Sequence, residues 1–403
     1  MTIRVLHRRG TGHEGPVDPL TNPYAGDMSS EMNPSGAGRY PGPEPRPVLS
    51  QLPPYAAGKP PREIPGLAPY KLSSNENPVP PLPSVLTDVA RFEAYNRYPD
   101  TLCTALREVL APELDVPAED IVTGAGSLGA LTQVLAAFAG RNDDGVADEV
   151  VYAWRSFEAY PIVVETAGAQ SVQVPLLPDG RHDLDAMADA VTQNTSVVIL
   201  CTPNNPTGPV LRTAEVEAFL ERVPQDVLVV VDEAYIEFIT EPDAVNGIDL
   251  YRRHPNVLSL RTFSKAYGLA NLRIGYTVAP PEITRHLRAV ATPFAVSGVA
   301  EAAAISSVRH RDELDVRVKG IVAERERVVA ALHEQGWEIP EAQGNFVWLP
   351  LGEAATAFAA LAEDHALSVR AFAGDGVRVS IGEDEANTRF LEVAEQYLRE
   401  HHS

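Results

Sequence analysis

The middle third of this 403-residue chain contains short apolar runs that leave few choices of fold. The runs are rich in β-branched residues and do not alternate with polar residues, which is typical of strands buried on both faces of a sheet. They lie at 149–153, 196–202, 227–231 and 257–260. A helix predicted at 213–222 separates two of them, and this strand–helix–strand order indicates a parallel sheet covered by helices.

Further elements are predicted on both sides of this region. A strand at 121–123 runs into a glycine-rich segment and a helix at 130–139. A long helical region is predicted at 299–335. After it come a segment at 346–351, a predicted helix at 354–363, predicted strands at 367–372 and 377–381, and an amphipathic helix over 390–398. We therefore predict an α/β fold, with a large domain whose mostly parallel sheet is covered by helices and a smaller α+β domain.

The composition of the N-terminus sets it apart from the rest of the chain. The first 50 residues hold seven Gly and eight Pro without a repeat, a composition typical of disorder, and we predict a disordered tail at 1–48. The predicted segments that follow are an arm at 49–88 that adds to the small domain, the large domain at 89–290 and the small domain at 291–403.

Charge and composition limit the partners and the location. The net charge is −22, which argues against nucleic acid and anionic membrane surfaces as partners. No apolar run is long enough to span a bilayer. Arg8 and Arg9 are not followed by the apolar segment of an export signal, and the two cysteines suit a reducing compartment, so we expect a cytoplasmic protein.

The basic residues are unusual because 29 of the 33 are Arg and only four are Lys. Arg is a poor amine nucleophile, so Schiff-base chemistry would depend on Lys59, Lys71, Lys265 or Lys319. Lys265 directly follows a predicted strand and lies among small hydroxyl residues. Lys59 and Lys71 belong to the N-terminal arm, and Lys319 lies in a charged helix.

A glycine-rich segment, GAGSLG at 124–129, lies between a predicted strand and a predicted helix. It predicts a phosphate bound at a helix N-terminus, although an ordinary turn has the same composition. It also matches the G-x-G-x-x-G pattern of dinucleotide sites, so an NAD-dependent oxidoreductase is an alternative. The next strand runs into WRSF at 154–157 and not into the acid that such a site requires.

Three polar side chains follow three successive predicted strands. Asn205 lies in NNPTG, Asp232 ends a run of valines, and Lys265 follows Thr262 and Ser264. Each alone fits a turn, a helix cap or a surface lysine. Because the carboxyl ends of parallel strands meet at one edge, an amide, an acid and an amine should converge beside the phosphate site. This set of groups predicts pyridoxal phosphate (PLP), which needs an amine for its aldehyde and an acid for its ring nitrogen.

The motifs NNPTG, DEAY and SKAYGLANLRIGY occur here in the order and spacing of the fold type I PLP aminotransferases, which the chain resembles over about 52–397. The resemblance implies an aspartate-aminotransferase-like fold with the PLP site in the large domain. LPPY at 52–55, LSSNENP at 72–78 and NRYPD at 96–100 are similar to the histidinol-phosphate aminotransferase branch.

The resemblance implies a role for each matching residue. Lys265 matches the Schiff-base lysine, and Asp232 matches the partner of the ring nitrogen. Asn205 and Tyr235 match groups that bind the phenolic oxygen, and Phe157 matches the ring that stacks on the cofactor. The residues that match phosphate contacts are Ala125, Gly126, Thr262, Ser264 and Arg273.

Other matches concern the substrate and the assembly. Tyr98 matches a residue that reaches the phosphate of the neighbouring subunit, which implies a homodimer. Arg378 matches the arginine that binds the substrate α-carboxylate, and Asn205, Tyr55 and Asn345 match positions around the substrate. The resemblance implies no metal site.

The substrate follows from finer similarities. Three segments of the chain are similar to those of the actinobacterial aromatic (phenylalanine) aminotransferases: the short stretch 369–379, WRSFEAYP and NFVWLPLG. They imply transfer between phenylalanine or tyrosine and 2-oxoglutarate, giving the aromatic 2-oxo acid and glutamate. The alternative within the branch is histidinol phosphate, in histidine biosynthesis. A cofactor-binding regulatory domain is the non-enzymatic alternative, although the tail has no DNA-binding pattern.

Overall fold

The computed structural model describes residues 45–50, 52, 55, 58–142 and 144–401. Pro47–Ser403 forms one compact unit, which contains every element described below. Of the tail predicted at 1–48, residues 1–44 lie outside the described part of the chain. No helix in the described part is both long and apolar enough to cross a bilayer.

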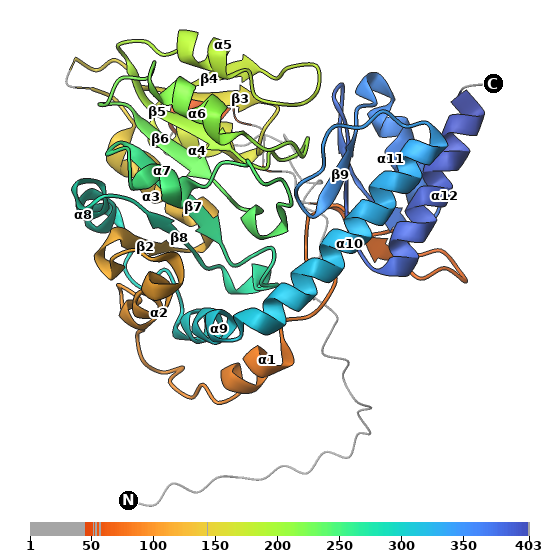
Figure 1. The fold of residues 1–403 in the computed structure, drawn as a ribbon, viewed down its shortest axis with the longest axis horizontal. Coiled ribbons are helices and arrows are strands. Elements are labelled where there is room, and N and C mark those ends of the chain that lie inside the picture. Colours follow the sequence, from red (N-terminus) through yellow and green to blue (C-terminus); the bar gives the residue numbers. More distant parts are fainter. Residues whose placement is uncertain (1–44, 51, 53–54, 56–57, 143, 402–403) are drawn as a thin grey trace, which may run out of the picture. The chain divides into compact units, whose positions relative to one another are not determined.

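A seven-stranded sheet forms the larger part of this unit (Figure 1). The strand order is β2-β8-β7-β6-β5-β3-β4, and β8 runs antiparallel to the other six strands, which share one direction. The strands are β2 (Ile121–Gly124), β3 (Glu149–Trp154), β4 (Gln170–Pro175), β5 (Thr195–Cys201), β6 (Leu228–Asp232), β7 (Val257–Thr262) and β8 (Gly275–Val278). The prediction of a mostly parallel sheet is confirmed, and the five predicted strands are present.

The strand β4 was not predicted. It lies at the sheet edge, where Gln170 is exposed, and its sequence QSVQVP alternates polar and apolar residues. An edge strand needs no continuous apolar run because one side of it faces solvent. The sequence of β4 therefore lacks the pattern that predicts a fully buried strand.

Helices cover both faces of this sheet because successive strand residues point to opposite sides. Val150 and Tyr152 of β3 pack with α3 (Gly126–Phe138), α4 (Ala159–Ala167) and α8 (Pro281–Val290). Val151 and Ala153 pack on the other face with α5 (Leu184–Asp189), α6 (Thr213–Leu220) and α7 (Gly247–Tyr251). The predicted helices at 130–139 and 213–222 correspond to α3 and α6.

A second, smaller layer of strands and helices follows in the C-terminal third. The strands β11 (Arg370–Phe372), β12 (Gly376–Ser380) and β9 (Phe346–Leu349) form an antiparallel sheet in this order, beside α11 (Ala355–Glu363) and α12 (Asp384–His401). The prediction of one strand over 367–372 was wrong. Its first two residues form β10 (Leu367–Ser368), which pairs with β1 (Tyr70–Lys71) of the N-terminal arm in a separate sheet.

The helical region predicted at 299–335 consists of two helices, α9 (Gly298–Arg309) and α10 (Arg311–Gln335). The first packs against α1 (Pro83–Val89) and α2 (Thr104–Leu114), and α10 extends from it toward β9, α11 and α12 (Figure 1). Short 3-10 turns complete the described elements: η1 (Pro47–Ser50), η2 (Ala118–Asp120), η3 (Ile236–Phe238), η4 (Ala270–Leu272) and η5 (Gly352–Ala354). The domain boundaries at 88/89 and 290/291 stay predictions.

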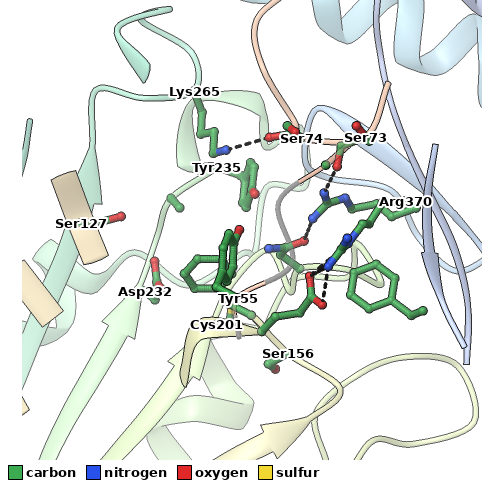
Figure 2. A pocket seen from close by; sticks show the side chains of 17 residues that line it. Tyr55, Ser73, Ser74, Ser127, Ser156, Cys201, Asp232, Tyr235, Lys265 and Arg370 are labelled. Atoms are coloured by element: carbon green, nitrogen blue, oxygen red, sulfur yellow. Dashed lines mark hydrogen bonds and ion pairs between the residues drawn. The ribbon is translucent and has the colours of Figure 1, made fainter. Parts of the chain in front are cut away.

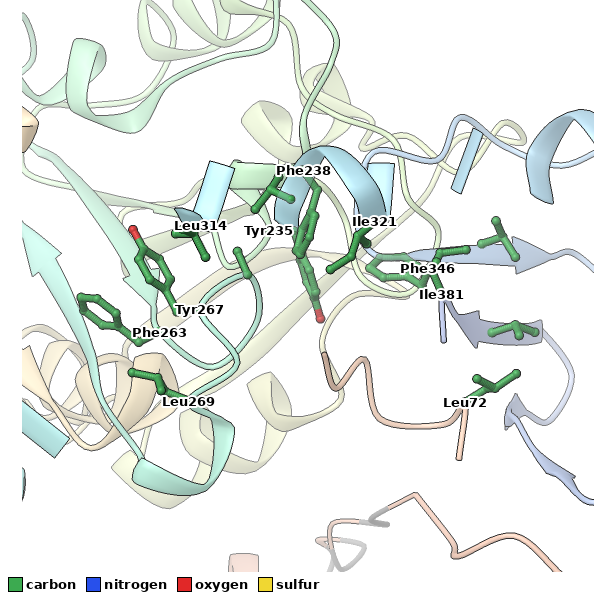
Figure 3. Close-up of a cluster of buried hydrophobic side chains, with 14 of the residues drawn as sticks. Leu72, Tyr235, Phe238, Phe263, Tyr267, Leu269, Leu314, Ile321, Phe346 and Ile381 are labelled. Carbon is green, nitrogen blue, oxygen red and sulfur yellow. The ribbon is translucent and has the colours of Figure 1, made fainter. Parts of the chain in front are cut away.

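One apolar cluster connects the end of β6 to the smaller sheet (Figure 3). Tyr235 and Phe238 follow β6, and the ring of Tyr235 meets the ring of Phe346 on β9 edge to face, with centroids 5.1 Å apart. Ile321 of α10 and Ile381 belong to the same cluster. The segment that carries Tyr235 is therefore joined to β6 of the larger sheet and packed against β9 of the smaller sheet.

Replacing Phe238 by Ala should lower the free energy of unfolding by about 3–5 kcal/mol, because this fully buried side chain would leave a cavity in the cluster. Denaturation in urea measures the change. Val316→Ala on α10 is the control, since Val316 is 71% exposed and its loss should change stability by less than about 0.5 kcal/mol. Equal effects of the two substitutions would contradict the role given to this cluster.

Candidate active site

A pocket opens at the carboxyl ends of β5 and β6 (Figure 2). This is where an α/β sheet is expected to bind a ligand. Seven of the residues predicted for the site line it: Tyr55, Phe157, Asn205, Asp232, Tyr235, Lys265 and Arg378. The structure thus brings together residues that lie more than 300 positions apart in the sequence.

Lys265 alone among the four lysines, all of which the structure describes, lines this pocket. Its Nζ donates to the backbone carbonyls of Ser74 and Asn75, each at 3.4 Å. Burial, and secondarily the charge of Arg378, lower the pKa of the amine to about 7. A large fraction of this amine is therefore neutral near pH 7 and able to act as a nucleophile or a base.

Asp232, the last residue of β6, is buried at the base of the pocket. The hydroxyl of Tyr160 on α4 donates to its Oδ2 at 2.7 Å. No group in the described part of the chain donates to Oδ1, although this atom is also buried. Burial raises the pKa of Asp232 to about 6, and the Tyr160 hydrogen bond acts against this rise. The carboxyl group thus has one acceptor atom prepared for a cationic donor.

Arg378 of β12 reaches across the pocket to the loop after β5. Its Nη1 donates to Asn205 Oδ1 at 2.5 Å and its Nη2 to the carbonyl of Ser73 at 2.7 Å. Its Nε is buried and receives no partner from the described residues. All of these acceptors are neutral, so the guanidinium keeps its full charge for an anionic ligand.

Tyr235 is held by the N-terminal arm. Asn75 donates from its Nδ2 to the Tyr235 hydroxyl at 3.0 Å, and its Oδ1 accepts from Ser380 at 2.9 Å. Asn345 is fully buried and donates to the carbonyl of Asn75 at 3.3 Å. Asn345 does not line the pocket, so the structure places it behind the arm.

The residues predicted for a phosphate form a linked group beside Lys265. Thr262 lies 3.0 Å from Ser264, Oγ1 to Oγ, and Arg273 donates from Nη1 to Ser264 Oγ at 3.3 Å. Gly126 starts α3 with a φ of 74°, and a Cβ there would collide with the guanidinium of Arg273. The helix N-terminus, two hydroxyls and an arginine together suit an anion.

The remaining predicted residues lie at the edges of this arrangement. Ala125 directly precedes α3 and is not in the lining of the pocket, whereas its near neighbour Ser127 is. Tyr55 lines the pocket and is 53% exposed. Tyr98 lies elsewhere, is 82% exposed, and stacks on Phe294 with ring centroids 4.5 Å apart.

Several residues of the site were missed by sequence reasoning. Apart from Ser127, which belongs to the predicted GAGSLG segment, they reach the pocket or a predicted residue through the tertiary fold: Ser73, Ser74, Asn75, Ser156, Glu158, Tyr160, Cys201, Arg370 and Phe372. Tyr160 had a possible signal, because it lies one helical turn after the predicted stacking ring Phe157 and packs against it edge to face. The LSSNENP motif also pointed toward Ser73, Ser74 and Asn75, but only through resemblance.

Comparison with known proteins identifies the family. The family model described as aminotransferase class I and II matches residues 69–393. The chain belongs to this family. An aromatic amino acid aminotransferase of Streptomyces avermitilis is 54% identical over 359 residues, which are 89% of this chain and 98% of that protein. One of Streptomyces coelicolor is 53% identical over the same length with the same coverage.

Solved structures agree with this assignment. A histidinol-phosphate aminotransferase from Sinorhizobium meliloti in complex with pyridoxal-5'-phosphate superposes with a TM-score of 0.77 at 27% identity, covering 91% of this chain and 99% of that one. An aspartate aminotransferase from Thermotoga maritima shares the fold, with a TM-score of 0.73 at 19% identity over 82% of this chain and 92% of that one. The predicted fold type and family are confirmed, and the oxidoreductase alternative is wrong.

The predicted cofactor, PLP, is confirmed with the family, and the residues present fit it. The unpartnered Oδ1 of Asp232 suits a protonated ring nitrogen, and the amine of Lys265 suits the aldehyde. The space that a Cβ at Gly126 would fill lies against Arg273, where a phosphate would be held. Within the described ranges there is no group of three or more acidic, His or Cys side chains that could bind a metal ion.

The pKa of Lys265 makes a prediction for the cofactor-free protein. Burial lowers this pKa from 10.5 to about 7, so between these values the folded chain binds fewer protons than the unfolded chain. Its free energy of unfolding should therefore rise with pH across this window. Lys265→Met should remove this pH dependence, because Met carries no titrating amine. The variant should therefore be more stable than the wild type at pH 7, and this difference in the free energy of unfolding should shrink by pH 10. A difference that does not change with pH would contradict the burial of a titrating amine.

Proposed function

We propose that this aminotransferase transfers the amino group of an aromatic L-amino acid, phenylalanine or tyrosine, to 2-oxoglutarate. The observation that carries the proposal is the arrangement of Lys265, Asp232 and Arg378 around one pocket whose walls include aromatic rings. The names of the Streptomyces relatives, at 53–54% identity over nearly their whole length, support the aromatic substrate.

Arg378 binds the α-carboxylate of the amino acid in this proposal. Its guanidinium is fixed by Asn205 and Ser73, and its Nε is free to donate. A planar guanidinium held on two sides orients a carboxylate better than a flexible ammonium does. The α-carbon of the substrate is thereby directed toward Lys265.

Lys265 moves the proton. Its Nζ, neutral in part near pH 7, accepts the proton from the substrate α-carbon and returns it as the product forms. When bound, PLP supplies an electron-accepting ring that stabilises the negative charge left by this proton. Asp232 holds the ring nitrogen protonated, and Tyr160 keeps Asp232 oriented and ionised.

The side chain of the substrate packs against aromatic rings in this proposal. Phe157, Tyr55 and Phe372 line the pocket, and apolar faces favour a flat aromatic side chain. The structural likeness to the Sinorhizobium meliloti enzyme, whose name specifies histidinol phosphate, supports that substrate as the second candidate.

We also propose a homodimer in which Tyr98 completes the phosphate site of the neighbouring subunit. The supporting observation is that Tyr98 is 82% exposed and lies outside its own chain's pocket lining, beside the exposed ring of Phe294. We further propose that Ala125 contacts the phosphate and that Asn345 and Tyr55 lie around the substrate. The predicted domain boundaries and a cytoplasmic location are also part of the proposal.

Steady-state kinetics test the substrate. With 2-oxoglutarate as acceptor, kcat/KM for phenylalanine or tyrosine should exceed that for histidinol phosphate by about 100-fold or more, since a pocket that leaves a phosphate without a partner loses several kcal/mol. Lys265→Ala should abolish turnover of every substrate. A higher kcat/KM for histidinol phosphate than for phenylalanine and tyrosine would contradict the aromatic substrate and support the second candidate.

The proposed dimer has its own test. Light scattering should give twice the 43.5 kDa chain mass, and Tyr98→Phe should weaken PLP binding by about tenfold, the effect of one hydrogen bond to a phosphate. Tyr95→Phe is the matched control, because Tyr95 is similarly exposed and nearby but is given no role. Equal PLP affinity of the two variants would contradict the role of Tyr98.

A further inference from the structure

The charged side chains of the pocket are unequally paired. Five charged residues belong to its described lining: Glu158, Asp232, Lys265, Arg370 and Arg378. With PLP bound, the Lys265 amine and the Asp232 carboxylate are taken up by the cofactor. Glu158, Arg370 and Arg378 therefore determine the charge that a substrate meets.

Arg370 of β11 is fully engaged by Glu158, which directly precedes α4. Its Nη2 donates to both carboxylate oxygens at 2.7 and 2.8 Å, and its Nε donates to Oε2 at 3.2 Å. The side chains are only 14% and 26% exposed. A bidentate pair so shielded from water is among the stronger ion pairs that a protein can make.

Arg378 has no such partner. It donates only to the neutral oxygens of Asn205 and Ser73, and no carboxylate in the described part of the chain forms an ion pair with it. Arg155, near the same rim, is paired with Asp375 at 2.6 Å. The pocket thus has one uncompensated cation, which matches one carboxylate of a substrate.

We propose that Glu158 is a specificity-determining residue: it neutralises Arg370, and thereby lowers the affinity of the pocket for every ligand with a second, distal anionic group, including the proposed acceptor 2-oxoglutarate. This inference deepens the proposed function and rests on it. A substrate with a distal phosphate or carboxylate has to displace Glu158 from Arg370, and the displaced carboxylate then repels it. An uncharged ring leaves the pair intact and packs beside it, against Phe372.

Ligand binding to the PLP holoenzyme tests this directly. The probes are glutarate, which has a distal carboxylate, and 3-phenylpropionate, which has a ring in its place; calorimetry gives the Kd of each. Glu158→Gln should lower the Kd of glutarate about tenfold relative to that of 3-phenylpropionate, because Arg370 is left with a free charge. The same variant should lower the KM for 2-oxoglutarate and narrow the kcat/KM gap between phenylalanine and histidinol phosphate.

Two further variants separate the charge effect from a structural one. Glu158→Gln combined with Arg370→Gln removes both charges of the pair and leaves Arg378 as the one uncompensated cation, as in the wild type, so the Kd ratio should return to within about threefold of the wild-type ratio. Asp364→Asn removes an acid from the exposed Arg62–Asp364 pair, away from the pocket, and should leave the ratio unchanged.

The outcomes are distinct. A Kd ratio that Glu158→Gln changes by less than about twofold, or a change that persists in the double variant, would overturn the inference while leaving the aromatic assignment standing. If wild-type enzyme turned over histidinol phosphate and not phenylalanine, the proposed function would fail. The two probe affinities would still report whether Glu158 masks Arg370.

Discussion

The parallel pairing of β5, β6 and β7 brings the amide, the acid and the amine of the site to one edge of the sheet. Cys201 at the end of β5 pairs with Asp232 at the end of β6, and Asp232 pairs with Leu260 of β7. Asn205 and Lys265 follow their strands by a few residues. Buried valine and leucine side chains on both faces of the sheet hold these strands in register. The core packing therefore also determines where the amide, the acid and the amine lie.

The opposite wall depends on the N-terminal arm and the smaller sheet. The arm supplies the carbonyls that accept from Lys265 and Arg378, and Asn75 connects Tyr235 to Ser380 of β12. Arg370 and Arg378 lie opposite each other in the register of β11 and β12. Arg370, Phe372 and Arg378, which would meet the substrate, therefore come from segments distant in sequence from Asp232 and Lys265.

This division explains what could be predicted from the sequence. Strand ends are local features, so Asn205, Asp232 and Lys265 were found from apolar runs and the polar residues after them. Phe157 and Arg378 were reached through family motifs. Tyr160 and the Glu158–Arg370 pair were missed, because their partners are brought close only by the packing of α4 and β11. The edge strand β4 was missed because it lacks a continuous apolar run, and the separation of β10 from β11 was missed because it depends on tertiary neighbours.

The central claim is that Lys265 is the one amine of this chain that bonds to PLP. Borohydride reduction of the holoenzyme, followed by proteolysis and mass spectrometry, tests it by fixing the cofactor to the lysine that holds it. We expect one pyridoxyl phosphate group per chain, on the peptide that contains Lys265. Its presence on Lys59, Lys71 or Lys319, with Lys265 unmodified, would contradict the account.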